Sequence, residues 1–258
     1  MEGKTKLIVV AGPKDLVRAG DAGYPVGHLL YSVSRDGTLL AADKDASSGA
    51  LMVLDLSRYG GADPAAAAAE VTFVLDSRGY RALLVDPGTG ASRPVLRLAA
   101  LLCQTCRRLA IPFYTYSPVQ KVCPGAVTVL SSALSGGTLE GHLAAGQKRY
   151  GALALEVEPC RHDFSLPDRS GQGRSLSRQE LDRLLEQHRP RCFFSPELCV
   201  NYFTYRCGRS AHMVLYDTAG TIAQKLKTAS SAGIETAFVY YGAVEGCISH
   251  LADLYPPG

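Results

Sequence analysis

Short, almost wholly apolar runs alternate with longer segments of helical periodicity along most of the chain. A run that is apolar on both of its faces is typical of a strand in a parallel sheet, because helices cover such a sheet from both sides. Strands are therefore predicted at residues 7–11, 28–34, 50–56, 82–86, 111–116, 152–158, 192–195 and 236–241, with further extended segments at 126–130 and 211–216.

The segments between these runs carry the start and stop signals of helices. Asp63-Pro64 opens one of them, with Asp as the N-cap and Pro at the first helical position, and Gly79 ends it. Apolar residues then repeat with helical spacing over 93–109. Further helices are predicted at 138–149, from the capping sequence at 175–180 to 188, and at 218–231.

This alternation predicts a parallel sheet with helical crossovers. Eight strand–helix units within 258 residues fit a closed barrel, which needs about 250 residues, better than an open sheet of about five or six strands. The predicted fold class is α/β, a single (β/α)8 TIM barrel over residues 1–258. In this prediction 152–158 is the sixth barrel strand and 192–195 the seventh, 161–173 is an exposed polar loop, and 252–258 is a frayed tail.

The charge balance argues against a nucleic-acid partner. The formal net charge is +3 and the basic residues are spread along the chain, whereas nucleic-acid binding predicts a concentrated basic patch. The apolar run at 7–11 is too short for the core of a secretory signal peptide. No run reaches the ~20 apolar residues of a membrane span. We therefore expect a cytoplasmic protein with no membrane span, and its oligomeric state stays open.

Eight cysteines raise the question of disulfides and metals. We expect reduced, mostly buried thiols, because Cys is among the most buried residue types and disulfide scaffolds are usually short secreted chains. Cys103 and Cys106 share one face of a predicted helix, and Cys160 with His162 is a lone pair of candidate zinc ligands. No metal and no cofactor is predicted. Zinc binding, and a disulfide or redox role for the thiols, are the alternatives.

Several segments, taken in order, carry the features of one known family. These are 28–32 with the turn 36–39, 50–56 with the loop 59–61, the stretch 79–88, and the unit 217–242. Together they resemble glycoside hydrolase family 18, the chitinase-like barrels, and especially the bacterial branch with spore-cortex and germination glucosaminidases. The resemblance implies a barrel that acts on N-acetylglucosamine glycans such as chitin or peptidoglycan, by a substrate-assisted mechanism in which a Glu protonates the leaving oxygen.

The fourth-strand signature of that family, G-[FY]-D-G-x-D-x-D-x-E, is incomplete in this chain. Arg81, Leu84 and Gly88 stand where the resemblance implies two Asp and the catalytic Glu, and only Asp86 is retained. Glycine cannot donate a proton, and the loss of a positioned general acid costs roughly 10²–10⁴-fold in rate. The family's last-strand Trp aligns with Tyr240, and the chain contains no Trp.

Three carboxylates are the candidates for any remaining chemistry. Asp86 ends a predicted strand, where barrel active sites gather, although Asp86-Pro87-Gly88 is also a good turn sequence. Glu156 and Glu158 interrupt an apolar strand with the same parity, so both can face the barrel interior. Near Asp86 they would repel one another, and one can acquire a raised pKa and act as an acid, or they can hold a cation or an amino sugar. The alternative is an exposed Glu158 and a Glu156 paired with an Arg.

Aromatic and polar residues near other strand ends are candidates for substrate binding, because tyrosines with acids suit sugar stacking and hydroxyl recognition. The alternative for each is packing within the barrel or its loops. The candidates are Tyr31, Tyr116, Glu197, Tyr202 and Tyr240.

Three functions follow from this reading. The leading hypothesis is a family 18-like pseudoenzyme that binds an amino-sugar oligosaccharide of the peptidoglycan or chitin type without the family's hydrolysis. The second is an active glycosidase with relocated carboxylates, Glu156 or Glu158 working with Asp86. The third is a structural or assembly protein of a bacterial spore, an association that rests on the resemblance.

Overall fold

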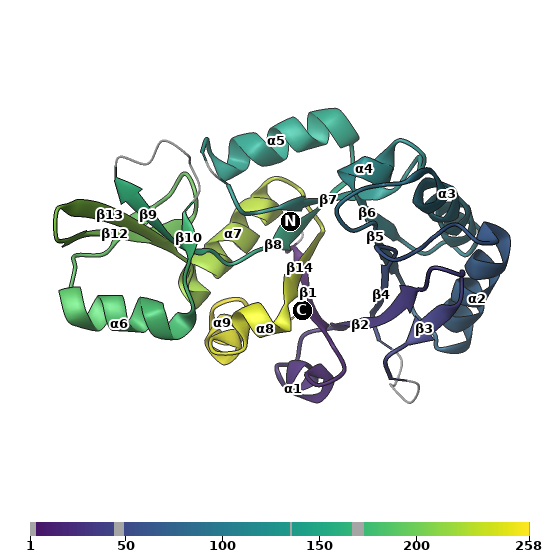
Figure 1. The fold of residues 1–258 in the computed structure, drawn as a ribbon, viewed down its shortest axis with the longest axis horizontal. Coiled ribbons are helices and arrows are strands. Elements are labelled where there is room, and N and C mark those ends of the chain that lie inside the picture. Colours follow the sequence, from purple (N-terminus) through teal and green to yellow (C-terminus); the bar gives the residue numbers. More distant parts are fainter. Residues whose placement is uncertain (1–3, 44–48, 135, 167–172, 258) are drawn as a thin grey trace.

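Eight parallel strands close into a barrel in the computed structural model, which describes residues 4–43, 49–134, 136–166 and 173–257 (Figure 1). Each strand pairs with its neighbour in sequence order around the ring, and β1 pairs with both β2 and β14 to close it. The barrel strands are β1 (Lys6–Ala11), β2 (Val26–Val33), β4 (Leu51–Asp55), β5 (Leu83–Asp86), β6 (Phe113–Tyr116), β7 (Val127–Ser131), β8 (Leu153–Val157) and β14 (Thr236–Tyr240). The predicted barrel is confirmed.

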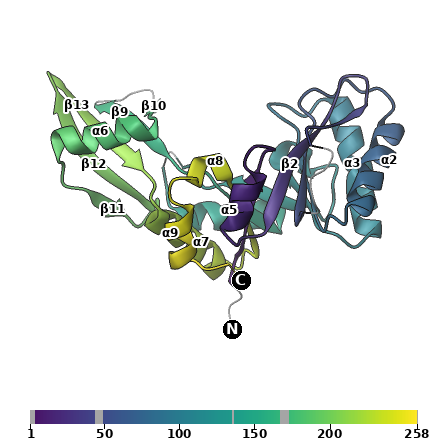
Figure 2. The ribbon, with the colours of Figure 1, turned by 90° about the horizontal axis from the view of Figure 1, so that it is seen from below.

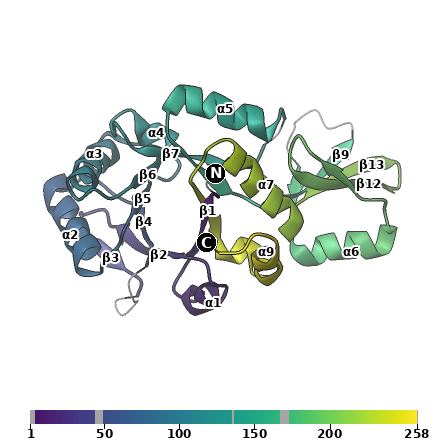
Figure 3. The same cartoon turned by 180° about the vertical axis from the view of Figure 1, so that it is seen from behind.

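Helices cover the outside of the barrel between the strands (Figures 1 and 3). The predicted start at Asp63 is present, since its side chain accepts a hydrogen bond from the N–H of Ala66 at 3.0 Å. The helices associated with the barrel are α1 (Leu16–Asp21), α2 (Pro64–Ser77), α3 (Arg93–Arg108), α4 (Ser117–Gln120), α5 (Leu139–Tyr150), α7 (Ala219–Ser231), α8 (Tyr241–Val244) and α9 (Ile248–Leu254).

Side chains that alternate along each strand divide the core into two layers. One set fills the barrel interior and includes Leu51, Val53, Leu84 and Tyr114. The other set packs between the strands and the helices. Side chains two residues apart in a strand point to the same face. The next inward position after Leu84 is therefore Asp86, at the carboxyl end of the barrel. Leu84 and Asp86 thus share the inward face of β5.

An antiparallel sheet is inserted between β8 and α7 and lies at one end of the molecule (Figure 2). Its strand order is β10-β9-β13-β12-β11, and α6 (Arg178–His188) packs on it. A separate short strand, β3 (Leu39–Ala41), pairs antiparallel with β2. The inserted strands are β9 (Arg161–Leu166), β10 (Arg174–Ser175), β11 (Phe193–Ser195), β12 (Val200–Cys207) and β13 (Ser210–Tyr216).

The insert corrects the predicted strand count. The sixth barrel strand is β7, which the sequence marked only as extended, and the segment 152–158 is the seventh. Segment 192–195, predicted as the seventh barrel strand, is β11 at the edge of the inserted sheet. A short apolar run has the same pattern in a buried barrel strand and in an edge strand, so the pattern cannot distinguish them. The polar loop predicted at 161–173 begins with β9, and its residues 167–172 lie outside the described ranges.

The C-terminal segment expected to fray is packed against the barrel. Tyr255 is buried, its hydroxyl donates to the carbonyl of Thr5 at 2.7 Å, and its carbonyl accepts from the hydroxyl of Tyr24 at 2.5 Å. The prediction of a tail that frays from residue 252 is wrong for the described part, because α9 continues to Leu254 and Tyr255 anchors it. Residue 258 lies outside the described residues.

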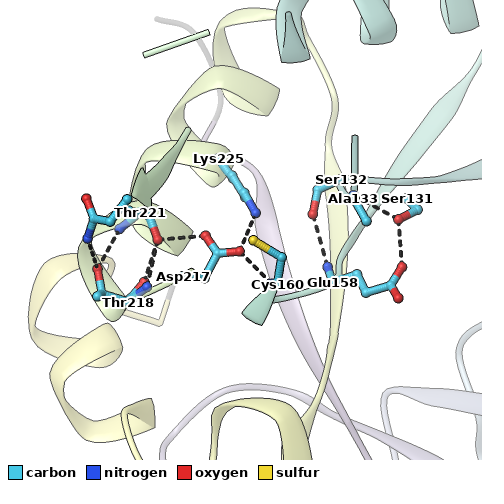
Figure 4. Close-up of polar contacts among 10 residues, drawn as sticks. Ser131, Ser132, Ala133, Glu158, Cys160, Asp217, Thr218, Thr221 and Lys225 are labelled. Atoms are coloured by element: carbon cyan, nitrogen blue, oxygen red, sulfur yellow. Dashed lines mark hydrogen bonds and ion pairs between the residues drawn. The ribbon is translucent and has the colours of Figure 1, made fainter. Parts of the chain in front are cut away.

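A buried ion pair holds the two ends of the insert together (Figure 4). Asp217, which follows β13, accepts Nζ of Lys225 at 2.6 Å, and each side chain is 1% exposed. The same carboxylate accepts the backbone N–H of Cys160 at 2.8 Å, and its other oxygen accepts the hydroxyl of Thr221 at 2.7 Å. The chain enters the insert at Cys160 and leaves it at Asp217, so this carboxylate fixes both ends to α7.

Substituting Asp217 by Ala is expected to lower the free energy of unfolding by about 3–5 kcal/mol, because it leaves the Lys225 ammonium buried without a partner. Urea denaturation followed by circular dichroism measures this change. The double substitution Asp217→Leu with Lys225→Met is expected to recover much of the loss, since it removes both charges.

The matched control is Asp182→Asn, which breaks an exposed pair with Arg178 at 3.9 Å. Exposed pairs contribute only about 0–1 kcal/mol. A loss of stability in Asp217→Ala no larger than in this control would contradict the structural role of the buried pair.

Candidate functional site

Carboxylates and a tyrosine gather at the carboxyl ends of the barrel strands. Asp55 and Asp86 are partners in the register of β4 and β5. On the two strands that flank β7, the hydroxyl of Tyr116, at the end of β6, donates to Oε1 of Glu156 on β8 at 3.2 Å. The carboxyl ends of parallel barrel strands share one rim, which is where barrel enzymes place their active sites. We call Asp86, Tyr116, Glu156 and Glu158 the acidic rim.

The electrostatics of Glu156 follow from this crowding. Burial raises the pKa of its carboxyl, and the neighbouring charges of Glu158 and Asp86 raise it further, while the hydrogen bond from Tyr116 lowers it. Burial also raises the pKa of the Tyr116 hydroxyl, and Glu156 and Asp86 add to that effect. Glu156 is therefore a carboxyl that holds its proton more tightly than an exposed one.

Glu158 lies at the outer edge of the acidic rim and is exposed, as one alternative for this residue predicted. Its Oε2 accepts the hydroxyl of Ser131 at 2.8 Å, and its backbone N–H donates to Oγ of Ser132 at 3.0 Å (Figure 4). The companion alternative, a Glu156 paired with an Arg, is not observed within the described ranges, where the partner of Glu156 is the hydroxyl of Tyr116.

Asp86 also shapes the loop that follows it. Its Oδ1 accepts the backbone N–H of Gly88 at 2.8 Å, and Asp55 accepts the N–H of Ser57 in the same way at 2.7 Å. Gly88 has a φ of +70°, and a Cβ at this position would lie 2.7 Å from the Cβ of Ser57. The turn role predicted for Asp86 is thus present, and its charge also acts to raise the pKa of Glu156. Its role in an active site stays a prediction.

The two tyrosines predicted at neighbouring strand ends differ in position. Tyr240 ends β14 and is 48% exposed, so its ring is accessible at the rim. Tyr31 is 2% exposed, belongs to the core layer between strands and helices, and its hydroxyl lies 3.1 Å from that of Tyr80. The prediction that Tyr31 lines the cleft is therefore wrong, and the alternative, packing within the barrel, is the one observed. β2 has a bulge between Leu29 and Tyr31, and Tyr31 packs in the layer between strands and helices.

Glu197 and Tyr202 belong to the insert rather than to the acidic rim. Both line a mainly apolar groove of about 770 Å³, together with Phe164, Leu198 and Met213. Oε2 of Glu197 accepts the hydroxyl of Ser195 at 3.0 Å, and the Tyr202 ring stacks on Phe193 with centroids 5.5 Å apart. Both predicted residues thus lie on the insert, and the groove also includes Leu134, which follows β7 of the barrel.

Asp55 is the rim residue that sequence reasoning missed. The sequence contains the pattern that identifies it. Asp55 ends the third strand two residues after Val53 and four after Leu51, both of which point into the barrel interior. The same rule that selected Asp86 therefore also selects Asp55.

Neither a metal site nor a membrane span is found in the described part of the chain. No group of three His, Cys, Asp or Glu side chains there has an arrangement suited to a metal ion. None of the helices described is both long and apolar enough to cross a bilayer. All eight cysteines have free thiols, and Cys103, Cys106, Cys123 and Cys199 are buried.

Solved structures match the fold of this protein over almost the whole chain. The spore cortex-lytic enzyme SleL of Bacillus cereus superposes with a TM-score of 0.71 at 13% identity, covering 100% of this chain and 75% of that chain. A chitinase from Chromobacterium violaceum gives 0.67 at 12% identity, with 97% and 98% covered. A mutant class V chitinase from Nicotiana tobaccum in complex with NAG4 gives 0.65 at 10% identity, with 98% and 99% covered.

The chain has the fold of the chitinase-like barrels. The fold expected from the family resemblance is thus confirmed. No protein-family model matches the chain, and a comparison with curated proteins gave no match.

Two substitutions in this chitinase-like barrel are expected to move the pKa of Glu156 in opposite directions. Tyr116→Phe raises it, because it removes the hydrogen bond that favours the carboxylate, and Asp86→Asn lowers it, because it removes a neighbouring negative charge. A titration of the carboxyl carbons by NMR measures both shifts. Shifts of the same sign in the two variants would contradict this account of the acidic rim.

Glu156 is also expected to make stability depend on pH. Its folded pKa is raised above the ordinary value of 4.5, so the folded state binds more protons than the unfolded state between the two values. Stability contributed at low pH is lost as the pH rises through that interval. Denaturation at several pH values measures this effect, and the loss of stability with rising pH should be smaller in Glu156→Gln than in the wild-type protein. An unchanged pH profile in this variant would contradict the assignment.

Proposed function

We propose that this protein binds glycans containing N-acetylglucosamine, of the chitin or peptidoglycan type, without cleaving them by the route of glycoside hydrolase family 18. The binding surface in this proposal is the acidic rim of the barrel with the accessible ring of Tyr240. The fold supports it, since one structural neighbour is a chitinase in complex with NAG4 and others are spore cortex-lytic enzymes.

The observation that carries the proposal is the backbone of Gly88. The family resemblance aligns Gly88 with the Glu that protonates the leaving oxygen. The φ of +70° is a conformation that residues with side chains rarely adopt, and Ser57 occupies the space that a Cβ would need. The loop after β5 is therefore shaped around a residue with no side chain, and no proton donor stands at this position.

The acidic rim keeps groups that suit sugar binding. The carboxylates of Asp86 and Glu158 are acceptors for hydroxyl hydrogens, and the ring of Tyr240 presents an apolar face for stacking. Sites of this kind combine aromatic surface with a few polar groups that orient the ligand. Loss of the general acid alone removes roughly 10²–10⁴-fold in rate, so retained binding with no measurable turnover is the expected behaviour.

Long incubation with N-acetylglucosamine oligomers and with muropeptides is expected to leave both pools unchanged by mass spectrometry, while calorimetry detects binding that weakens in Tyr240→Ala. Gly88→Glu is expected to give no turnover, because its backbone and Ser57 do not accommodate the side chain. The matched control for Tyr240 is Tyr150→Ala, on the outer helix α5. New shorter sugars from the wild-type protein would refute the proposal.

One observation favours a second function, an active glycosidase with relocated carboxylates. Glu156 is a buried carboxyl with a raised pKa, next to the charge of Asp86, and a pair of carboxyls with separated pKa values is the arrangement of many glycosidases. In this case the products would disappear in Glu156→Gln and in Asp86→Asn. They would persist in Glu197→Gln, whose side chain lies in the insert.

A role in spore assembly is the third candidate, and spore localisation is proposed with it. Phe193 and Phe194 on the edge strand β11 are 41% and 45% exposed, and exposed apolar residues that lie together can mark a contact with another protein. Two structural neighbours are the spore cortex-lytic enzymes SleL of Bacillus megaterium and Bacillus cereus. Self-association that is lost in Phe193→Ser with Phe194→Ser, observed by sedimentation, would favour this function.

A further inference from the structure

A cavity of about 590 Å³ lies between the insert and the C-terminal helices. Its walls are formed by the segment after β8, by α6, by the start of α7, and by α8 and α9. Figures 1 and 3 show α6, α7 and α9 beside one another. Because β8 and β14 are neighbours in the barrel, the residues that follow these two strands meet here. Pro159 lines the cavity and directly follows Glu158 of the acidic rim.

Basic side chains from three different elements line this cavity. They are Arg161 at the start of β9, Arg178 at the start of α6, and His250 on α9. The guanidinium of Arg178 lies directly over Gly246, since a Cβ on that glycine would overlap its Nη1 atom. The insert therefore places two guanidinium groups opposite the C-terminal helices of the barrel.

Cys247 lines the same cavity as Arg161 and Arg178. Burial raises the pKa of its thiol, the charges of Arg178 and Arg161 act to lower it, and the charge of Asp217 acts to raise it. The two arginine charges therefore act together on a side chain of the cavity wall.

The acids around the cavity do not neutralise this charge. Asp217 is engaged by Lys225, by the N–H of Cys160 and by the hydroxyl of Thr221. Asp182 approaches Nε of Arg178 only to 3.9 Å, and both of these side chains are more than half exposed. Within the described ranges, Arg161 forms no ion pair.

The N-terminus of α7 adds to the positive electrostatic potential of the cavity. Thr218, Ala219 and Gly220 line the cavity, and they begin a helix of thirteen residues. The side chain of Thr218 caps this turn by accepting the N–H of Thr221. The positive end of the helix dipole favours negative charge at this place.

We propose that this cavity binds the carboxylate or phosphate group of a small organic anion. A guanidinium presents paired N–H donors that match the oxygens of either group, and the volume is in the range of small-molecule sites. The cavity has its own lining, separate from the residues of the acidic rim, so the inference goes beyond the proposed glycan site and does not depend on it. Chitin oligomers carry no such anionic group, whereas muropeptides carry carboxylates.

The test is binding of inorganic phosphate and, separately, of acetate to the whole chain, followed by NMR chemical shifts at constant ionic strength maintained with sodium chloride. Saturable binding of either anion is expected in the wild-type protein, and the stronger of the two identifies the preferred group. Arg161→Gln and Arg178→Gln are each expected to weaken it about tenfold or more, because a charged hydrogen bond contributes about 1.5–3 kcal/mol.

Two further variants separate the site from general charge effects. Arg183→Gln removes an exposed charge from α6 outside the cavity and is expected to leave the affinity unchanged. Gly246→Ala keeps every charge but displaces the Arg178 guanidinium, and it is expected to weaken binding like Arg178→Gln. No saturable binding of either anion, or equal losses in Arg183→Gln and in the cavity variants, would overturn the proposal.

Discussion

The carboxylate of Asp217 is the contact on which the arrangement of the two sheets depends. It is buried, it pairs with Lys225 on α7, and it accepts the N–H of Cys160, where the chain leaves the barrel for the insert. An insert of this size needs its two ends held close together, since otherwise its position relative to the barrel would vary. One charged, fully hydrogen-bonded group at that junction thus positions the groove of the insert and the basic cavity beside the barrel.

The acidic rim has a different origin, which is the two-residue period of the strands. Every second side chain of a barrel strand points inward, and eight parallel strands end at one rim. An acid with inward parity at a strand end is therefore brought near acids that lie far away in the sequence. Burial raises the pKa of Glu156 for this reason, and the charges of Glu158 and Asp86 add to that effect.

The two candidate sites are complementary in charge. The acidic rim carries carboxylates and accessible aromatic surface, whereas the cavity next to it carries Arg161 and Arg178. Gly88 stands where the family resemblance implies a Glu, its N–H donates to Asp86, and Ser57 occupies the space that a Cβ would need. Under the proposed function, the rim would contact a sugar and the cavity would add a second contact with an anion.

The sequence by itself determined the barrel, most of its strands and the acids at their ends, because strand parity and helix signals are local. It also predicted Asp86, Tyr116, Glu156 and Tyr240 at the rim. Only the tertiary structure decided that 192–195 belongs to an inserted sheet, that a bulge turns Tyr31 into the core, and that Tyr255 is buried. These features depend on pairing between distant segments, which a pattern of apolar residues does not encode. The basic cavity is of the same kind, since Arg161, Arg178 and His250 meet only after the insert has docked on the barrel.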